Sequence, residues 1–176
     1  LSVNMDPAGQ LWIGTPHGLI QAIPNAEGLK FVLHKNNSND PQSLNCNSVL
    51  ATLDDPIQPE RFLWLGTKGG GLNHFDKRTG TVKHFTTSEG LSNNVVYAVL
   101  PDSEGCIWLS TNYGLSKFDP KTGVFQNFFS VDGLQENEFN TLSYARAADG
   151  RLYFGGVNGI TAFYPSELKA TATSPP

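Results

Sequence analysis

One short block of sequence recurs four times along this chain, and that recurrence limits the possible folds more than any other feature. The four versions are LWIGT (11–15), LWLGT (63–67), IWLST (107–111) and LYFGG (152–156). Their aromatic residues are Trp12, Trp64, Trp108 and Tyr153, which follow one another at intervals of 52, 44 and 45 residues. Such regular spacing indicates a repeated structural unit of about 45 residues.

Each repeat has the pattern of several short β-strands. Apolar and polar residues alternate before each block, and a glycine followed by apolar residues comes after it, as in GLNHFD (71–76). The period of two and the frequent Gly and Pro residues favour strands over helices. Gly9, Gly105 and Gly150 complete short turns between the first and second strands, where glycine supplies a positive φ angle. In the second repeat this turn is longer, DDPIQPER (54–61).

A four-stranded antiparallel unit that repeats about every 45 residues is the signature of a β-propeller blade. We therefore expect an all-β fold, a β-propeller fragment of about four blades in residues 1–168. The blades are expected at approximately 1–35, 47–86, 94–129 and 140–168. No clear strand pattern follows residue 168, so the last blade is expected to have three strands and residues 169–176 to form a C-terminal tail or linker. We expect the structural core between blades to contain Trp12, Trp64, Trp108 and Tyr153.

The composition argues against several classes of protein. The chain carries 12 Lys and Arg against 16 Asp and Glu, with no basic cluster, so neither nucleic acid nor a membrane surface is an expected partner. No apolar run approaches the roughly 20 residues that span a bilayer. Cys46 and Cys106 are too few for a disulfide scaffold and are not expected to pair. Leu1 begins the chain without a basic leader, which indicates a piece of a longer protein.

The stretch GLSNNVVYAVLPDSEGCIWLSTNYGLSKFDP (90–120) closely resembles the two-component regulator propeller repeat. That repeat runs from Gly-Leu-Ser through an alternating strand, an Asp-x-x-Gly turn and an apolar-Trp-apolar block to Gly-Leu and a closing aromatic-Asp. The resemblance extends over residues 2–168 in four repeats. The first repeat lacks the closing Phe-Asp-Pro, and the fourth, GGVNGITAFYPSEL (155–168), is similar to the family's last blade.

The resemblance implies a function. Propellers of this family form the periplasmic sensor domains of hybrid two-component system histidine kinases of the Bacteroidetes type. Many of them detect glycan fragments and switch on genes for polysaccharide utilisation. By this resemblance, the chain is expected to be a non-catalytic, ligand-binding part of the ectodomain of an inner-membrane receptor, with an oligosaccharide as its ligand and the kinase outside the chain.

The residues themselves offer no visible enzyme chemistry. The chain has four histidines, His17, His34, His74 and His84. They lack the spacing of metal ligands, so we expect no metal, no cofactor and no catalytic residues. The run KGGG (68–71) fits a turn between strands better than a phosphate loop, because no helix is expected after it. Glu136 and Glu138 share a loop and are weak candidates for acid–base work.

Ligand recognition is expected on one face of the propeller. The loops between second and third strands share that face with the connections between blades, and the repeats differ most in these segments. Six side chains suited to a sugar ring or a carboxylate lie there: His17, Lys68, Asn112, Tyr113, Asn137 and Asn158. We predict that they bind the ligand.

An arc of four blades leaves an apolar flank open at each end. We therefore expect self-association through these edges as a homodimer, in which two arcs close a ring of about eight blades. Two other functions stay open. One is a propeller-type polysaccharide lyase or hydrolase, which would need catalytic groups converging from several blades. The other is a protein–protein interaction propeller.

Overall fold

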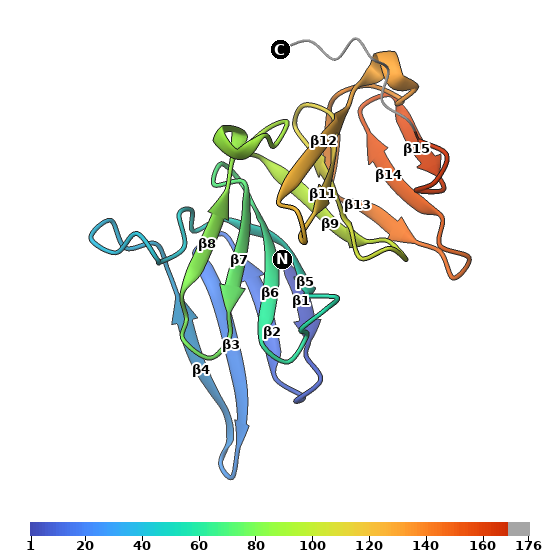
Figure 1. Ribbon diagram of the computed structural model, residues 1–176. Coiled ribbons are helices and arrows are strands. Elements are labelled where there is room, and N and C mark those ends of the chain that lie inside the picture. The colour runs from blue at the N-terminus through green and yellow to red at the C-terminus, as the bar shows by residue number, and fades with distance from the viewer. Residues whose placement is uncertain (169–176) are drawn as a thin grey trace.

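The structure, a computed structural model, describes residues 1–168 and contains four antiparallel sheets (Figure 1). The first sheet contains β1 (Ser2–Met5), β2 (Leu11–Thr15), β3 (Gly18–Asn25) and β4 (Gly28–His34). The second contains β5 (Val49–Asp54), β6 (Phe62–Thr67), β7 (Leu72–Asp76) and β8 (Val82–Phe85). The third contains β9 (Val96–Pro101), β10 (Ile107–Thr111), β11 (Leu115–Asp119) and β12 (Val124–Phe128). The fourth contains β13 (Phe139–Arg146), β14 (Leu152–Gly156) and β15 (Gly159–Phe163). The expected tail at 169–176 lies outside the described residues.

Each sheet is one blade, and its strands follow one another in chain order. The first strands, β1, β5, β9 and β13, contact those of the neighbouring blades, so the sheets stand side by side as an arc (Figure 1). The predicted all-β propeller fragment of four blades is confirmed, and its last blade has three strands as expected.

Two single turns of 3-10 helix interrupt the β-structure, although the sequence pattern predicts no helix. They are η1 (Thr87–Glu89) and η2 (Ser130–Asp132), and each opens a connection between two blades. In each turn a carboxylate accepts the backbone N–H three residues before it, Glu89 from Thr86 (2.6 Å) and Asp132 from Phe129 (2.8 Å). These local bonds favour a helical turn over an extended loop. No described helix is long and apolar enough to cross a membrane.

The tryptophan of each of the first three repeats marks the contact between two blades. Trp12, Trp64 and Trp108 are at most 2% exposed. Trp64 meets the edge of Phe118 in the next blade, with 5.5 Å between ring centroids. Trp12 makes the same kind of contact with Phe75. Because a single sheet cannot bury such rings alone, each blade depends on its neighbour for stability.

Glycine in the second strand lets neighbouring blades approach closely. A Cβ atom at Gly66 would lie 2.9 Å from the carbonyl oxygen of Val96 in the next blade. A Cβ atom at Gly14 would lie 3.1 Å from the carbonyl oxygen of Val49. Only a residue without a side chain fits there at the observed spacing of the blades.

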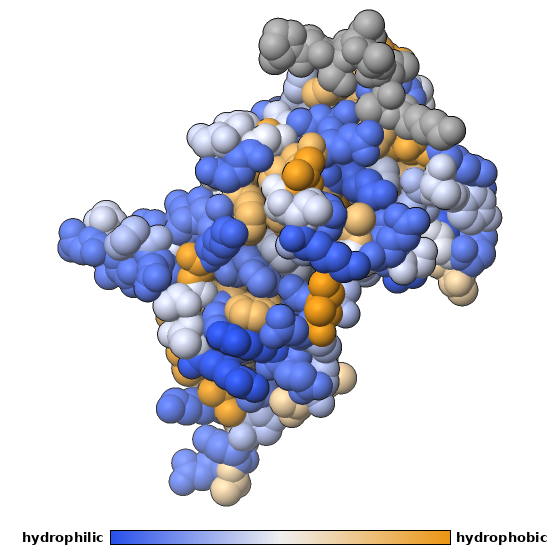
Figure 2. Space-filling model, in the orientation of Figure 1, coloured by the Kyte–Doolittle hydropathy of each residue, from blue (hydrophilic) through white to orange (hydrophobic). Residues whose placement is uncertain are grey.

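The two end blades each leave one face uncovered. Blade 1 exposes a row of apolar side chains: Val3, Met5, Leu29, Phe31 and Leu33. On blade 4, Tyr153 was expected in the core between blades, but it is only partly buried and lines an apolar hollow of about 330 Å³. Elsewhere, the face seen in Figure 2 is mostly hydrophilic, with hydrophobic atoms in separate patches. Self-association through the two end faces stays a prediction.

Candidate functional site

The loops between second and third strands rest on the connections between blades. The backbone N–H of Asn112, in the β10–β11 loop, donates to the carbonyl of Val95 (3.2 Å). The N–H of Lys68, in the β6–β7 loop, donates in the same way to Ser48 (2.9 Å). These bonds bring both kinds of segment together on one face of the arc, which we call the loop face.

The connections on the loop face share one internal design. Each contains a buried leucine: Leu44, Leu91 or Leu134. Each also has an asparagine whose side-chain oxygen accepts a backbone N–H: Asn47 from Asn36 (2.7 Å), Asn94 from Thr87 (2.9 Å) and Asn137 from Ser130 (2.7 Å). The predicted ligand-binding residue Asn137 therefore braces its own loop, and its recurrence has a structural cause.

A hollow of about 490 Å³ lies on the loop face, where the connection from blade 2 meets blade 3. Its lining residues are Thr87, Gly90, Leu91, Ser92, Tyr113, Asn127 and Phe129. One wall comes from the connection that includes η1, and the other from the β10–β11 loop and the end of β12. Of the predicted ligand-binding residues, Tyr113 lines this hollow. We call it the joint pocket.

Tyr113 and Phe129 form the aromatic wall of the joint pocket. Their ring centroids lie 5.3 Å apart, and Tyr113 is 49% exposed. A Cβ atom at Gly114 would lie 2.9 Å from the ring of Phe129, and Gly114 has a φ angle of +88°. Glycine at this position therefore allows both the turn and the close approach of the ring. Two adjacent rings can stack against the flat apolar face of a ligand.

Hydroxyl and amide groups form the polar part of the joint pocket. Asn127 accepts a hydrogen bond from the buried Ser116 hydroxyl (2.7 Å) and donates to the carbonyl of Gly90 (2.9 Å). The backbone N–H of Ser92 donates to the Ser116 hydroxyl (3.2 Å). These bonds tie the connection to blade 3. The side-chain amide of Asn127 has two N–H donors, so the second can serve a ligand hydroxyl.

Charged groups border the joint pocket without lining it. No Asp, Glu, Lys, Arg or His is among its described lining residues. Glu89 directly precedes Gly90, and its bonds from the backbone and hydroxyl of Thr86 lower the pKa of its carboxyl group. Asp132 accepts the backbone N–H of the lining residue Phe129. The carboxyl group of Glu89 is therefore ionised at neutral pH.

The remaining predicted ligand-binding residues lie apart from the joint pocket. His17, Lys68 and Asn158 are exposed in the loops of three other blades. Asn112 accepts a hydrogen bond from the hydroxyl of Tyr97 (2.8 Å). The six predicted residues are thus spread over the loop face and do not converge on one site, and their roles in binding stay predictions.

Sequence reasoning did not single out Ser92, Asn127 and Phe129. Ser92 belongs to the Gly-Leu-Ser that opens the repeat, and Phe129 follows β12 directly, so both fit a purely structural role. The one available signal was their position beside variable loops. Only the folded arrangement shows that segments 35 residues or so apart line one pocket.

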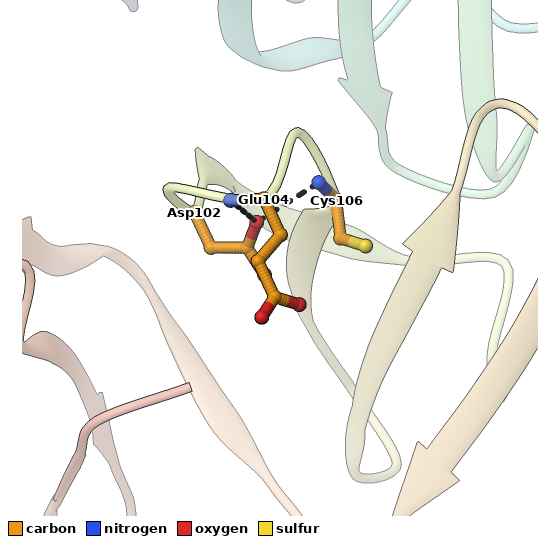
Figure 3. A group of neighbouring side chains, drawn as sticks. All are labelled: Asp102, Glu104 and Cys106. Atoms are coloured by element: carbon orange, nitrogen blue, oxygen red, sulfur yellow. Dashed lines mark hydrogen bonds between the residues drawn. The ribbon is translucent and has the colours of Figure 1, made fainter. Parts of the chain in front are cut away.

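Asp102, Glu104 and Cys106 form a group that could be taken for a metal site, since their ligand atoms lie within 4.8 Å of one another (Figure 3). However, one oxygen of Asp102 already accepts the backbone N–H groups of Glu104 and Cys106 (2.9 Å each). The ammonium of Lys117 lies 3.8 Å from Asp102 and supplies positive charge. Burial raises the pKa of the Cys106 thiol, which keeps it protonated and a poor ligand. The group is explained as a turn, and both Cys106 and Cys46 are free thiols.

The fold defines the chain as a segment of a β-propeller. Residues 90–113 match the family described as two component regulator propeller. This match confirms the resemblance found in the sequence for the same repeat.

The similar proteins include a histidine kinase, an extracellular domain of a two component system and a lyase. The chain is 29% identical over 172 residues to histidine kinase P4 of Formosa agariphila, a comparison that covers 97% of the chain and 12% of the kinase. An extracellular domain from B. thetaiotaomicron, described as part of a hybrid two component system, is 24% identical with a TM-score of 0.79, over 98% of this chain and 24% of that one. Virginiamycin B lyase from Staphylococcus aureus is 14% identical with a TM-score of 0.61, over 96% of this chain and 57% of that one.

These likenesses differ in what they support. At 24% and 14% identity, the two solved structures show a common fold alone. The chain spans 12% of the length of the kinase, so the activity of the whole kinase is not transferred to it by similarity. What the chain does has to be argued from its own surface.

Proposed function

We propose that this chain is a non-catalytic, ligand-recognising segment of the extracytoplasmic sensor of a hybrid two-component system. The observation that carries the proposal is the joint pocket, in which an aromatic wall faces amide and hydroxyl groups on the loop face. The match to the regulator propeller family and the similarity to a histidine kinase support the class of protein. In this proposal the kinase belongs to a longer protein, and the sensor part lies in the periplasm.

The chemistry of the joint pocket favours a glycan fragment as the ligand. A sugar ring has one apolar face that stacks on Tyr113 or Phe129, and hydroxyl groups that pair with Asn127 and Ser92. Such a combination of a few placed polar groups with aromatic contacts is typical of small-molecule sites. An oligosaccharide is therefore the proposed signal.

The position of the pocket suggests how binding becomes a signal. Thr87 to Ser92 belong to the connection from blade 2, whereas Tyr113 and Phe129 belong to blade 3. A ligand that contacts both walls favours the conformations in which the two blades are held at one angle. In a receptor, that bias is passed on through the arrangement of paired ectodomains to the kinase.

The proposal is tested by titrating the 176-residue chain with a panel of oligosaccharides in a calorimeter. Tyr113→Ala is expected to weaken binding of any ligand found by about tenfold or more, because half of the aromatic wall is lost. Glu27→Ala, in the exposed turn between β3 and β4 and away from the loop face, is the control and should bind as the wild type does. Equal affinity of Tyr113→Ala and the wild type would contradict the site.

The same samples separate recognition from catalysis. A sensor segment returns the oligosaccharide unchanged after long incubation. New reducing ends or unsaturated products would favour the lyase or hydrolase alternative, to which the likeness in fold with virginiamycin B lyase gives some weight.

A further inference from the structure

The lining of the joint pocket is uncharged, although the chain carries many charged residues. The chain has a formal net charge of −4 and carries 28 Asp, Glu, Lys and Arg residues if the 12 basic and 16 acidic ones are taken together. None of the described lining residues of the joint pocket is among them. The pocket offers a ligand aromatic rings, hydroxyls and amides, and no counter-charge.

Two carboxylates in the connections next to the pocket are held by local hydrogen bonds. Glu89 is held by the N–H and the hydroxyl of Thr86, at 2.6 and 2.9 Å. Asp132 is held by the N–H of Phe129, at 2.8 Å. Both belong to the 3-10 turns η1 and η2, whose geometry depends on these bonds. Both carboxylates are therefore part of the fold of the connections.

We propose that the joint pocket selects a neutral ligand and rejects its anionic analogue, so that the glycan it recognises carries neither uronate nor sulfate groups on the bound ring. This inference rests on the proposed function and adds the charge of the ligand. An anion in the pocket would lose hydration without gaining a cationic partner. Glu89, the neighbour in sequence of the lining residue Gly90, adds a negative charge that repels an anion.

The test uses matched pairs of sugars that differ at one carbon. Oligosaccharides of mannose, glucose and galactose are each compared with the oligosaccharide of the corresponding uronic acid, in which a carboxylate replaces the CH₂OH group. The affinity of the chain for each member is measured by calorimetry at about 0.15 M salt, where distant charges are screened and nearby ones are not. The neutral member of a recognised pair is expected to bind about tenfold tighter or more.

Three variants assign the selectivity to this pocket. Glu89→Gln removes one border charge, and a glutamine can still make the bond back to Thr86. It is expected to narrow the preference for the neutral sugar several-fold. Thr87→Lys adds a cation to the lining and is expected to improve binding of the uronate, whereas Thr87→Gln is the uncharged control of similar length. The backbone N–H of Thr87, which donates to Asn94, is unaffected by either change.

The outcomes separate this inference from the proposed function. A uronate that binds as tightly as its neutral partner, or tighter, overturns the inference and leaves glycan recognition standing. A neutral preference that Thr87→Lys and Glu89→Gln both leave unchanged also overturns it, because the selectivity then arises elsewhere. If no member of any pair binds, the proposed function fails and the inference fails with it.

Discussion

Blades 2 and 3 bury the same tryptophan at the same place but treat its indole N–H differently. In blade 3, the N–H of Trp108 donates to Asp102 (3.0 Å), whose other oxygen closes the turn before β10. In blade 2, the N–H of Trp64 is buried without a hydrogen-bond partner among the described residues. Asp55, which occupies the equivalent place, bonds His74 instead (2.8 Å).

The difference follows from the longer turn in blade 2. There the carboxylate of Asp55 accepts the backbone N–H groups of Ile57 and Gln58 (2.8 and 3.0 Å). His74 stacks on Trp64 with 3.9 Å between ring centroids and takes the remaining oxygen. The aspartate of the short turn thus has two roles, closing the turn and holding the indole, and a longer turn separates them.

Blade 4 agrees with this interpretation. Tyr153 replaces the tryptophan, and Ala147 replaces the aspartate, as its backbone bond to Arg151 shows (2.9 Å). A tyrosine has no indole N–H, so an aspartate carboxylate in the turn would have no indole donor to bind. Blade 4 therefore lacks both the tryptophan and the aspartate that bonds it in blade 3.

The largest effect on stability is expected at the position of the second strand that packs against the neighbouring blade. This position is Gly66 in blade 2 and Ser110 in blade 3. Gly66→Ser would place a Cβ atom 2.9 Å from the carbonyl of Val96, so blades 2 and 3 would have to move apart. We expect a loss of about 3 kcal/mol in the free energy of unfolding, measured by urea denaturation. Ser110→Gly creates no clash and should cost about 1 kcal/mol through backbone entropy. Equal losses would show that the close approach at Gly66 is not needed.

A smaller difference in the free energy of unfolding is expected between the Trp→Phe variants of blades 2 and 3. Trp108→Phe leaves the buried carboxylate of Asp102 without its indole donor, whereas Trp64→Phe removes an N–H that bonds nothing. Both variants lose a similar ring area. Trp108→Phe should therefore be the more destabilising by about 1 to 2 kcal/mol in the same urea experiment. If Trp64→Phe costs as much or more, the indole of Trp64 has an acceptor, such as an ordered water.

The repeat made most of the fold predictable, and the reason is physical. Blades contact only their neighbours, so one recurring pattern specifies each strand, turn and buried ring in turn. The spacing of Trp12, Trp64 and Trp108 was enough to predict the blades. It was not enough to predict that Asp55 would bond His74 and not the indole of Trp64, because that depends on where the longer turn places the Asp55 carboxylate.

The candidate site was less predictable for a related reason. Tyr113 could be named because it lies in a loop where the repeats differ. Ser92 and Phe129 lie within the repeated pattern, and their meeting in the joint pocket depends on how one connection folds onto the next blade. Repetition thus conceals residues that build the blade and line the pocket at the same time.

The smallest effect is expected from the His74 bond to Asp55, and it depends on pH. Burial alone would raise the pKa of Asp55, but hydrogen bonds from His74, Gln58 and Ile57 outweigh it and lower the pKa below its usual value of about 3.9. A carboxylate with a lowered pKa stabilises the folded state at pH values above that usual value, and the contribution is lost as the pH falls through the folded pKa.

His74→Phe tests this contribution. It keeps an aromatic ring stacked between Phe62 and Trp64 but removes the hydrogen bond to Asp55. We expect it to cost about 1 kcal/mol or less at pH 7, with the difference from the wild type shrinking below about pH 4. A difference that stays constant down to pH 3 would mean that His74 acts through packing alone, and blades 2 and 3 would then differ in shape and not in electrostatics.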